Sequence, residues 1–324
     1  MKRTRRQTKM EESYLRARNN NVLLAPKAMG DRALLARRVK DGEARRGYPG
    51  VYSIPSLEDG PSLRVEALAV IRTVAQKHPD WCFTAFSAAL VYGLWVPYGK
   101  LSHLYTCVDS LGCARRTPHI IVRRIKEPEI VSFDGIRLTS LRQTVAECAL
   151  LGDFPAALPI ADSALRFYDL EQAGLCGYAR CALRGRHGVS RALRCLEHAS
   201  ALAESGGESA VRGAIIQAGY MLPTELQRVI ANPVDGQGGF RVDMFWEFED
   251  GRQLIGEVDG ADKYVDPKML NGKTTADAII AERQRESLLN ATGIPVMRIL
   301  VKRLFEPGYL ERRLDAFGVP RDLA

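Results

Sequence analysis

The sequence predicts a multidomain protein of the α/β and α+β classes, and three observations lead to this fold class. Residues 204–324 read as helix, three strands, helix and strand, the order of an α/β domain built around a mixed sheet. Residues 1–58 read as short helices followed by a basic hairpin, and residues 59–203 mix helices with short strands. At 324 residues the chain is long enough for two or three domains, each with its own core.

The composition points to a globular protein of a reducing compartment. The hydrophobic fraction of 46% and the charged fraction of 26% are ordinary for such proteins, so neither disorder nor a fibrous class is indicated. No apolar run is long enough to cross a bilayer, and the basic N-terminus lacks the apolar segment of a secretory signal. Seven cysteines without CxxC pairs favour the cytoplasm. We therefore expect a cytoplasmic protein with no membrane partner.

The positive charge is concentrated at one end of the chain. Residues 1–46 contain 14 Lys or Arg and 5 Asp or Glu, a net charge of +9 (14 minus 5), whereas the whole chain carries +8. The remainder is therefore close to −1 (8 minus 9). A concentrated basic segment is the electrostatic pattern expected of a nucleic-acid contact. This pattern makes double-stranded DNA the expected partner.

The N-terminal domain, residues 1–58, has the outline of a winged helix-turn-helix. A helix over residues 11–18, a second element from Val22, and a helix over residues 31–40 precede the turn at residues 47–50. Asp31 is the expected N-cap of the third element, and Leu34, Leu35 and Val39 form its apolar stripe. The alternative is a small helical cap with a charged face. The candidate DNA contacts are Arg32, Arg37, Arg38, Lys40, Arg45 and Arg46.

The middle domain, residues 59–203, follows a turn-rich linker over residues 53–61 and carries no spacing that demands chemistry. Strands are expected over residues 101–108 and 120–124, and helices over residues 63–77, 84–94, 141–151, 156–167 and 172–203, the last broken by a loop at 184–188. Its polar residues are expected to be structural, and its thiols near His187 are expected to be ordinary buried thiols, since their spacing fits no usual zinc site. These residues are His103, His119, Arg142, Asp162, Cys176 and Cys181.

The C-terminal domain, residues 204–324, begins with a capping pattern in which Glu208 follows Ser205 by three residues. Strands are expected over residues 226–230 and 294–301, and a long helix over residues 277–290. Arg285 on that helix is expected to pair in solvent, whereas the role of Glu282 is left open.

Three acids lie on a predicted hairpin between residues 241 and 264. A three-residue loop at Glu249, Asp250 and Gly251, with Gly251 left-handed, would place residue 243 opposite residue 257. One residue of slip would reverse every side chain. In the three-residue register, Arg241, Asp243, Glu257 and Asp259 share one polar face, and Val242, Met244, Trp246, Phe248, Leu254 and Val258 share an apolar face. Adjacent carboxylates raise each other's pKa, and Mg²⁺ or Mn²⁺ relieves that cost.

The C-terminal motifs resemble those of the restriction-endonuclease superfamily, and more narrowly its very-short-patch-repair-like group. The matching pieces are RVD at 241–243, EVDGxxKY at 257–264 and AExxRExxLxxxGxxVxR at 281–298. The resemblance implies that Asp243 and Glu257 bind Mg²⁺, with support from Glu208. It also implies a catalytic Lys two residues after Glu257, where this chain has Asp259. Lys263 is the candidate replacement.

The first 200 residues are similar to AbiEi-type antitoxins of bacterial abortive-infection systems. The matching pieces are LLARRVKDGEARRGYPGVYS, FSAALVYGL and DGIRLTSLRQTVAECAL. The resemblance implies a winged-helix DNA-binding domain followed by an α+β domain, in a protein that can repress its own operon. It also implies a cognate toxin as a candidate partner.

Two functional hypotheses follow, and the sequence leaves both open. In the first, the protein is a metal-dependent DNA endonuclease of phage defence or a toxin–antitoxin system, with Asp243, Glu257, Asp259 and Lys263 in the catalytic site. In the second, it is an antitoxin-like regulator whose nuclease-like domain is catalytically silent. A third hypothesis, a structural ion site or interaction site, agrees poorly with the basic N-terminus.

Overall fold

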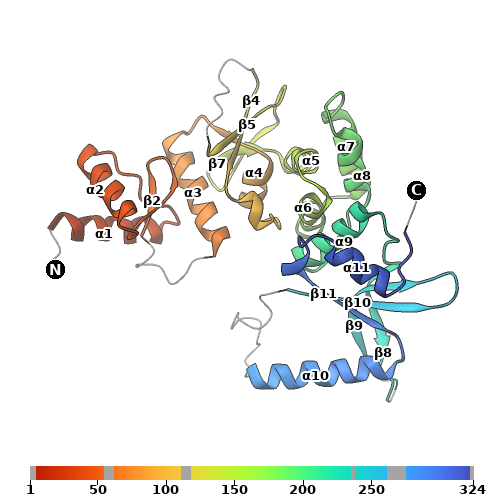
Figure 1. Cartoon of the computed structure of the whole chain (residues 1–324). Coiled ribbons are helices and arrows are strands. Elements are labelled where there is room, and N and C mark those ends of the chain that lie inside the picture. The colour runs from red at the N-terminus through yellow and green to blue at the C-terminus, as the bar shows by residue number, and fades with distance from the viewer. Residues whose placement is uncertain are drawn as a thin grey trace. The chain divides into compact units, whose positions relative to one another are not determined.

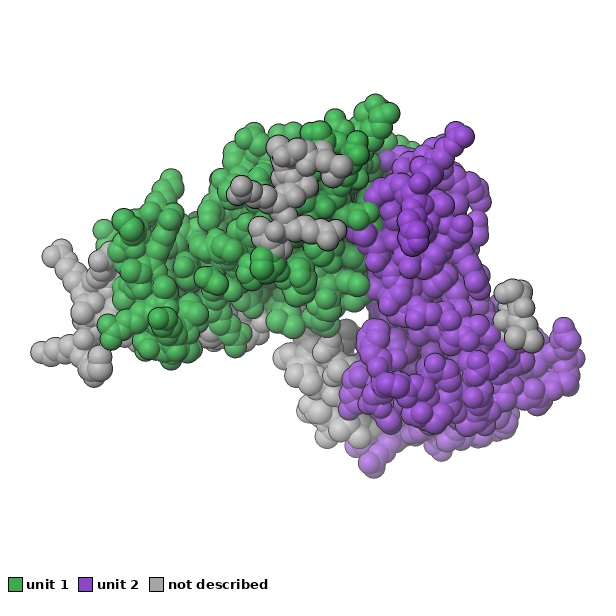
Figure 2. Space-filling model, turned by 45° about the horizontal axis from the view of Figure 1, so that its top comes forward, with its two compact units in different colours: residues 1–148 green, residues 149–324 purple. Residues whose placement is uncertain are grey.

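The computed structural model describes residues 5–54, 62–110, 118–234, 236, 238–260 and 275–321 (Figure 1). The chain divides into two compact units, residues 1–148 and 149–324 (Figure 2). This division falls within the expected middle domain and groups residues 149–203 with the C-terminal residues. The expected boundaries at 58 and 203 remain predictions, and most of the expected linker lies outside the described residues. Within the described residues, no helix is both long and apolar enough to cross a membrane.

The first unit begins with two helices and a hairpin, which are α1 (Arg5–Asn19), α2 (Met29–Lys40), β1 (Arg45–Tyr48) and β2 (Val51–Ser53). The expected apolar stripe of α2 is confirmed, because Leu35 is fully buried against Met10 and Tyr52, with Leu34 and Val39 packed beside it. The expected N-cap is wrong: α2 begins at Met29 after Ala28, and Asp31 lies in its first turn. There its carboxylate faces the positive end of the helix dipole instead.

Helix α3 (Leu63–Lys77) has the bounds that the sequence predicts, but it packs on the N-terminal hairpin. The Leu23 amide donates to Thr73 Oγ1 at 2.7 Å, and a Cβ added to Gly47 would lie 3.0 Å from Val70. The helix is therefore part of the same packed assembly as α1, α2 and the hairpin.

The rest of the first unit is an α+β assembly around a five-stranded mixed sheet. Its strand order is β5-β4-β3-β7-β6, with β3–β7 and β4–β5 parallel and the other two pairs antiparallel. Its elements are β3 (Cys82–Phe83), α4 (Ala85–Val91), β4 (Leu104–Val108), β5 (Ile120–Arg124), β6 (Ile130–Phe133), β7 (Ile136–Thr139) and α5 (Leu141–Leu151).

The second unit confirms the expected helix, three strands, helix and strand around a mixed sheet. Strand order is β11-β10-β9-β8, and only the β10–β11 pair of these described strands is parallel. The elements are α6 (Phe154–Phe167), α7 (Gln172–Ala182), α8 (Val189–Glu197), α9 (Gly206–Ala218), β8 (Glu225–Ala231), β9 (Gly239–Glu247), β10 (Gln253–Asp259), α10 (Thr275–Ala291), β11 (Val296–Leu300) and α11 (Tyr309–Ala316). Helix α11 is not among the elements that the sequence predicts.

The β9–β10 hairpin has the three-residue loop that the sequence predicts. Leu254 pairs with Trp246 and Gly256 with Met244, as this loop requires, and the pairing ends there, one residue before Asp243 and Glu257. Gly251 adopts a φ of 81°, the left-handed conformation that the loop requires.

The expectation of one polar sheet face is wrong in part. Five of the expected apolar residues lie in the core that α9 and α11 cover, whereas Val242 joins a second core on the α10 side. Phe245 and Ile255 are also fully buried there, against Leu289 of α10. A parallel β10–β11 pair needs a crossover helix over one face, so that face cannot be wholly polar. The expected alternation of side chains therefore fails at Val242, the residue before Asp243.

Candidate functional site

The acidic residues lie on three elements of the second unit. Glu208 lies in the first turn of α9, Asp243 on β9, and Glu257 and Asp259 on β10. Asp243 Oδ2 accepts a hydrogen bond at 2.8 Å from the amide of Val258, the residue after Glu257 on β10. The start of α9 lies against the same strand, since a Cβ on Gly207 would lie 3.8 Å from Val258 Cγ1.

Glu208 is held in place by its own helix end and by strand β8. Ser205 caps the helix, accepting from the Glu208 amide at 3.2 Å, and its hydroxyl donates to Glu208 Oε1 at 2.7 Å. Gln227, the residue across from Asp243 on β8, donates to Glu208 Oε2 at 2.9 Å. Burial raises the pKa of Glu208, and the nearby negative charges of Asp243 and Glu204 raise it further. Glu208 and Asp243 therefore act on each other electrostatically.

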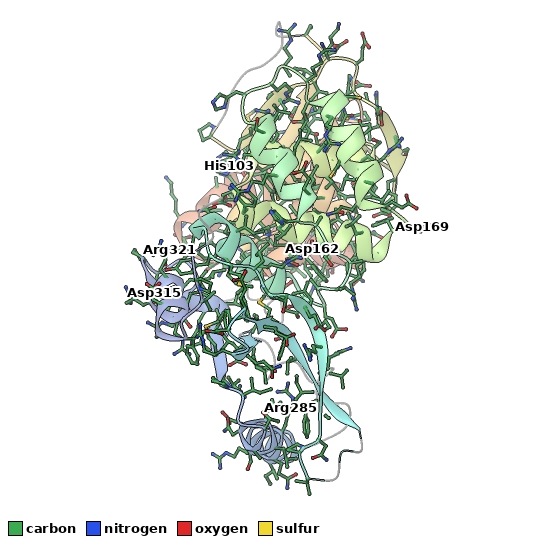
Figure 3. The ribbon with its side chains drawn as sticks, turned by 90° about the vertical axis from the view of Figure 1, so that its right-hand side faces the viewer. His103, Asp162, Asp169, Arg285, Asp315 and Arg321 are labelled. Carbon is green, nitrogen blue, oxygen red and sulfur yellow. The ribbon has the colours of Figure 1, made fainter. Side chains whose placement is uncertain are left out.

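Glu257 is a buried carboxylate paired with an arginine. It is 4% exposed, and its Oε1 accepts from Arg285 Nη2 at 2.8 Å. The same nitrogen donates to the Arg241 carbonyl oxygen at 3.0 Å. Figure 3 shows Arg285 reaching from α10 toward the sheet. The expectation that Arg285 pairs in solvent is therefore wrong, because α10 crosses the face that carries Glu257.

Asp259, which stands where the resemblance places a Lys, has an arginine beside it. Arg298 on β11 lies 3.3 Å from Asp259 Oδ2 and 3.6 Å from Glu286 Oε1 of α10. The parallel register brings Arg298 level with Glu257, and so onto the same face. The position at which the resemblance implies a catalytic lysine therefore carries the Asp259–Arg298 ion pair. Lys263 lies outside the described residues, as does the side chain of Glu282.

The donor set fits a hard divalent cation in its chemistry. Asp243, Glu257 and Glu208 offer carboxylate oxygens, the ligands that Mg²⁺ and Mn²⁺ prefer. They are not a preassembled site: among the described side chains, no three His, Cys, Asp or Glu are grouped so as to hold an ion. The arginine on Glu257 competes for the same oxygens, so a bound ion would have to displace that pair.

The basic candidates of the first unit divide into an exposed group and one buried residue. Arg38 is 8% exposed and pairs with Glu43 at 3.1 Å and Glu11 at 3.5 Å. It follows the buried Leu35 by three residues, so it shares the inward face of α2. This corrects its expected role as a DNA contact. The exposed group, which we call the α2–hairpin surface, is Arg32, Arg37, Lys40, Arg45 and Arg46.

Lys77 extends the α2–hairpin surface, although no motif in the sequence singles it out. A Cβ on Gly50 would lie 3.2 Å from Lys77 Nζ, so the ammonium group lies at the hairpin turn. Burial lowers the Lys77 pKa, and the positive charge of Arg32 lowers it further. Lys77 lies 45 residues after Arg32 in the chain (77 minus 32), so only the packing of α3 on the hairpin brings the two together.

The polar residues and thiols that the sequence analysis names in the middle region have different surroundings in the structure. Asp162 is fully buried and pairs with Arg212 at 2.7 Å. His103 and His119 line a small cavity of about 40 Å³ beside Tyr48. Cys176 is buried as expected, but Cys181 is exposed, which corrects the expectation for that thiol.

Comparison with known proteins finds relatives without an assigned activity. The chain is similar to two Mycobacterium tuberculosis proteins, uncharacterized protein MT2308 of strain CDC 1551 / Oshkosh and uncharacterized protein Rv2248 of strain ATCC 25618 / H37Rv. Each is 29% identical over 280 residues, which cover 86% of this chain and 93% of the relative. Only 44 residues (324 minus 280) lie outside the match, so it reaches into both compact units. No protein-family model matches the chain.

Proposed function

We propose that this chain is a DNA-binding protein whose C-terminal domain hydrolyses phosphodiester bonds with Mg²⁺ or Mn²⁺. The setting we propose is bacterial phage defence or a toxin–antitoxin system, with a cognate toxin as a further partner. The observation that carries the proposal is that Glu208, Asp243 and Glu257 lie on three elements around one mixed sheet, with Asp243 Oδ2 accepting from the amide of Val258, the residue after Glu257. Duplex binding is assigned to the α2–hairpin surface, and cleavage to the acidic site.

Each residue of the acidic site would have its own role in metal binding. Asp243 and Glu257 would hold the ion, and Glu208 would support it from α9. A divalent ion bound there lowers the pKa of a water and neutralises charge on the phosphate. In the hydrolysis, a water oxygen bonds to phosphorus, one ester P–O bond breaks, and the leaving oxygen takes up a proton. Asp243 is already oriented for this role by the Val258 amide.

A second function, a DNA-binding regulator with a silent nuclease-like domain, is favoured by a specific observation. Glu257 and Asp259 both lie against arginines, at 2.8 Å and 3.3 Å, and the residue two positions after Glu257 is an acid instead of a lysine. Such a regulator would bind its operator equally well in EDTA. Plasmid nicking, measured with metal and with EDTA, separates the two functions.

The α2–hairpin surface gives the DNA-binding proposal its own test. In Arg37→Ala/Lys40→Ala, duplex affinity is expected to fall, and the slope of log affinity against log salt to flatten by about 0.9 for each phosphate that is no longer neutralised. Both side chains are exposed, so the fold is expected to survive. Fluorescence anisotropy with a labelled duplex over a salt series measures the slope.

The matched control removes two exposed arginines from the other unit. Arg180→Ala/Arg184→Ala changes the net charge equally, and its salt slope is expected to equal that of the wild type. Equal slopes for all three proteins would move the DNA contact away from α2.

The raised pKa of Glu208 predicts how Mn²⁺ binding depends on pH. A carboxyl group whose pKa is raised takes up its proton at a higher pH than an ordinary glutamate, and the protonated form is a poor ligand. Mn²⁺ affinity is therefore expected to begin falling above the ordinary glutamate range as pH decreases. In Glu208→Gln the midpoint of that fall should move to lower pH, as measured by isothermal titration calorimetry. An unchanged midpoint would remove Glu208 from the metal site.

A further inference from the structure

A positively charged side chain contacts the acidic site, but it belongs to helix α10, whereas the resemblance implies a lysine on strand β10. The residue two positions after Glu257 is Asp259, and the arginine beside it, Arg298, also lies 3.6 Å from Glu286. Arg285 instead reaches Glu257 itself from α10. Strand β10 has no lysine at this position, and Arg285 of α10 provides the positive charge beside Glu257 instead.

The contacts of Arg285 place its guanidinium between the two strands of the hairpin. Its Nη2 donates to Glu257 Oε1 at 2.8 Å on β10 and to the Arg241 carbonyl at 3.0 Å on β9, two residues before Asp243. The Glu257 side chain is 5% exposed, whereas that of Arg285 is 24% exposed. One side of the guanidinium thus contacts the buried acid, and the group still borders solvent, from which a phosphate would approach.

We propose that Arg285 is the catalytic cation of this site, in the role that the resemblance gives to a lysine two residues after Glu257. The proposal rests on the proposed nuclease function. In the structure Arg285 neutralises Glu257. An ion held by Glu257 would replace this pairing and leave the guanidinium available to a phosphate of DNA, to which it can donate two parallel hydrogen bonds.

The chemistry of arginine limits what Arg285 can do. The guanidinium of an arginine stays protonated in proteins, so Arg285 cannot act as a general base. It stabilises the negative charge that builds on the phosphate oxygens as the new P–O bond forms and the ester bond breaks. The proton of the attacking water must therefore leave to another acceptor, such as solvent.

The test combines Mn²⁺ binding with cleavage. Arg285→Gln removes the charge that competes for Glu257, so Mn²⁺ affinity is expected to rise about tenfold or more, the equivalent of one hydrogen bond between charged groups. The cleavage rate at saturating Mn²⁺ is expected to fall about 100-fold, the usual effect of removing one hydrogen-bond donor that stabilises the charge of the transition state. Arg285→Lys keeps the positive charge but lacks the planar guanidinium with its paired donors. Its Mn²⁺ affinity and its cleavage rate are both expected to lie between those of Arg285→Gln and the wild type.

Arg180→Gln is the matched control, because it removes one arginine from an ion pair of 3.0 Å elsewhere in the same unit. Its Mn²⁺ affinity and cleavage should equal those of the wild type, and thermal melting establishes that each variant is folded. Wild-type protein that nicks DNA while Arg285→Gln nicks equally fast, or binds Mn²⁺ no more tightly, overturns the role of Arg285 alone. Wild-type protein that does not nick DNA overturns the proposed function itself.

Discussion

Asp243→Asn and Glu257→Gln are each expected to slow plasmid nicking by at least about 100-fold. Each change removes a charged oxygen ligand while keeping the size of the side chain, and metal-assisted charge stabilisation contributes several kcal/mol, with about 1.4 kcal/mol for each factor of ten. Glu257 is 4% exposed, so its amide variant also leaves Arg285 without this charged partner. Rates of conversion of supercoiled plasmid to open circles, with Mg²⁺ or Mn²⁺, measure the effect.

Glu247→Gln is the control for these two variants. Glu247 lies on the same strand as Asp243, but it is exposed and faces Arg228 at 3.9 Å. Its nicking rate is expected to match that of the wild type. If nicking persists in Asp243→Asn and Glu257→Gln, the activity belongs to another site or to a contaminant.

Asp162→Ala is expected to lower the free energy of unfolding by about 3–5 kcal/mol. Asp162 is fully buried on α6, where its Oδ2 accepts from Arg212 Nη2 at 2.7 Å and its Oδ1 from the Ser200 amide at 2.8 Å. Burial raises its pKa, and the nearby Arg212 guanidinium opposes that rise. Removing the carboxylate leaves Arg212, which is 7% exposed, as a buried charge without this partner.

The comparison for Asp162 is an exposed acid in a similar ion pair. Glu197 lies 3.0 Å from Arg180, with both side chains about half exposed, and Glu197→Ala is expected to cost no more than about 1 kcal/mol. Urea titrations of both variants give the two values. Equal destabilisation would show that the Asp162–Arg212 pair contributes no more than a surface pair.

The Asp162–Arg212 pair also bears on the acidic site. It joins α6 to α9, the helix whose first turn carries Glu208. Close packing accompanies the pair, since a Cβ on Gly213 would lie 2.6 Å from the Phe154 carbonyl oxygen. Residues 149–203 therefore pack against α9, the helix that carries Glu208, and this packing explains why they belong to the C-terminal compact unit.

Local patterns in the sequence predict much of the second unit. The alternation of side chains around Asp250-Gly251 is enough to select the β9–β10 register, because the three-residue loop separates most of the apolar side chains from the polar ones. The Ser205 cap is also predictable, since its partner Glu208 is three residues away. Both depend on interactions between residues that are close in the chain.

Two of the wrong predictions concern contacts between distant segments. The pairing of Arg285 with Glu257 requires knowing that α10 crosses the acidic face, and the burial of Arg38 requires knowing which side of α2 meets α1. Helical spacing alone shows that a residue lies on a face, but not what covers it. The same limit applies to Lys77, whose place at the hairpin depends on the packing of α3.

The most direct test of the central proposal is nicking of supercoiled plasmid by the purified full-length protein. The proposal predicts nicking with Mg²⁺ or Mn²⁺ that stops in EDTA, while duplex binding through the α2–hairpin surface persists in both conditions. Binding without nicking at any metal concentration or pH would contradict the nuclease function and favour the silent regulator.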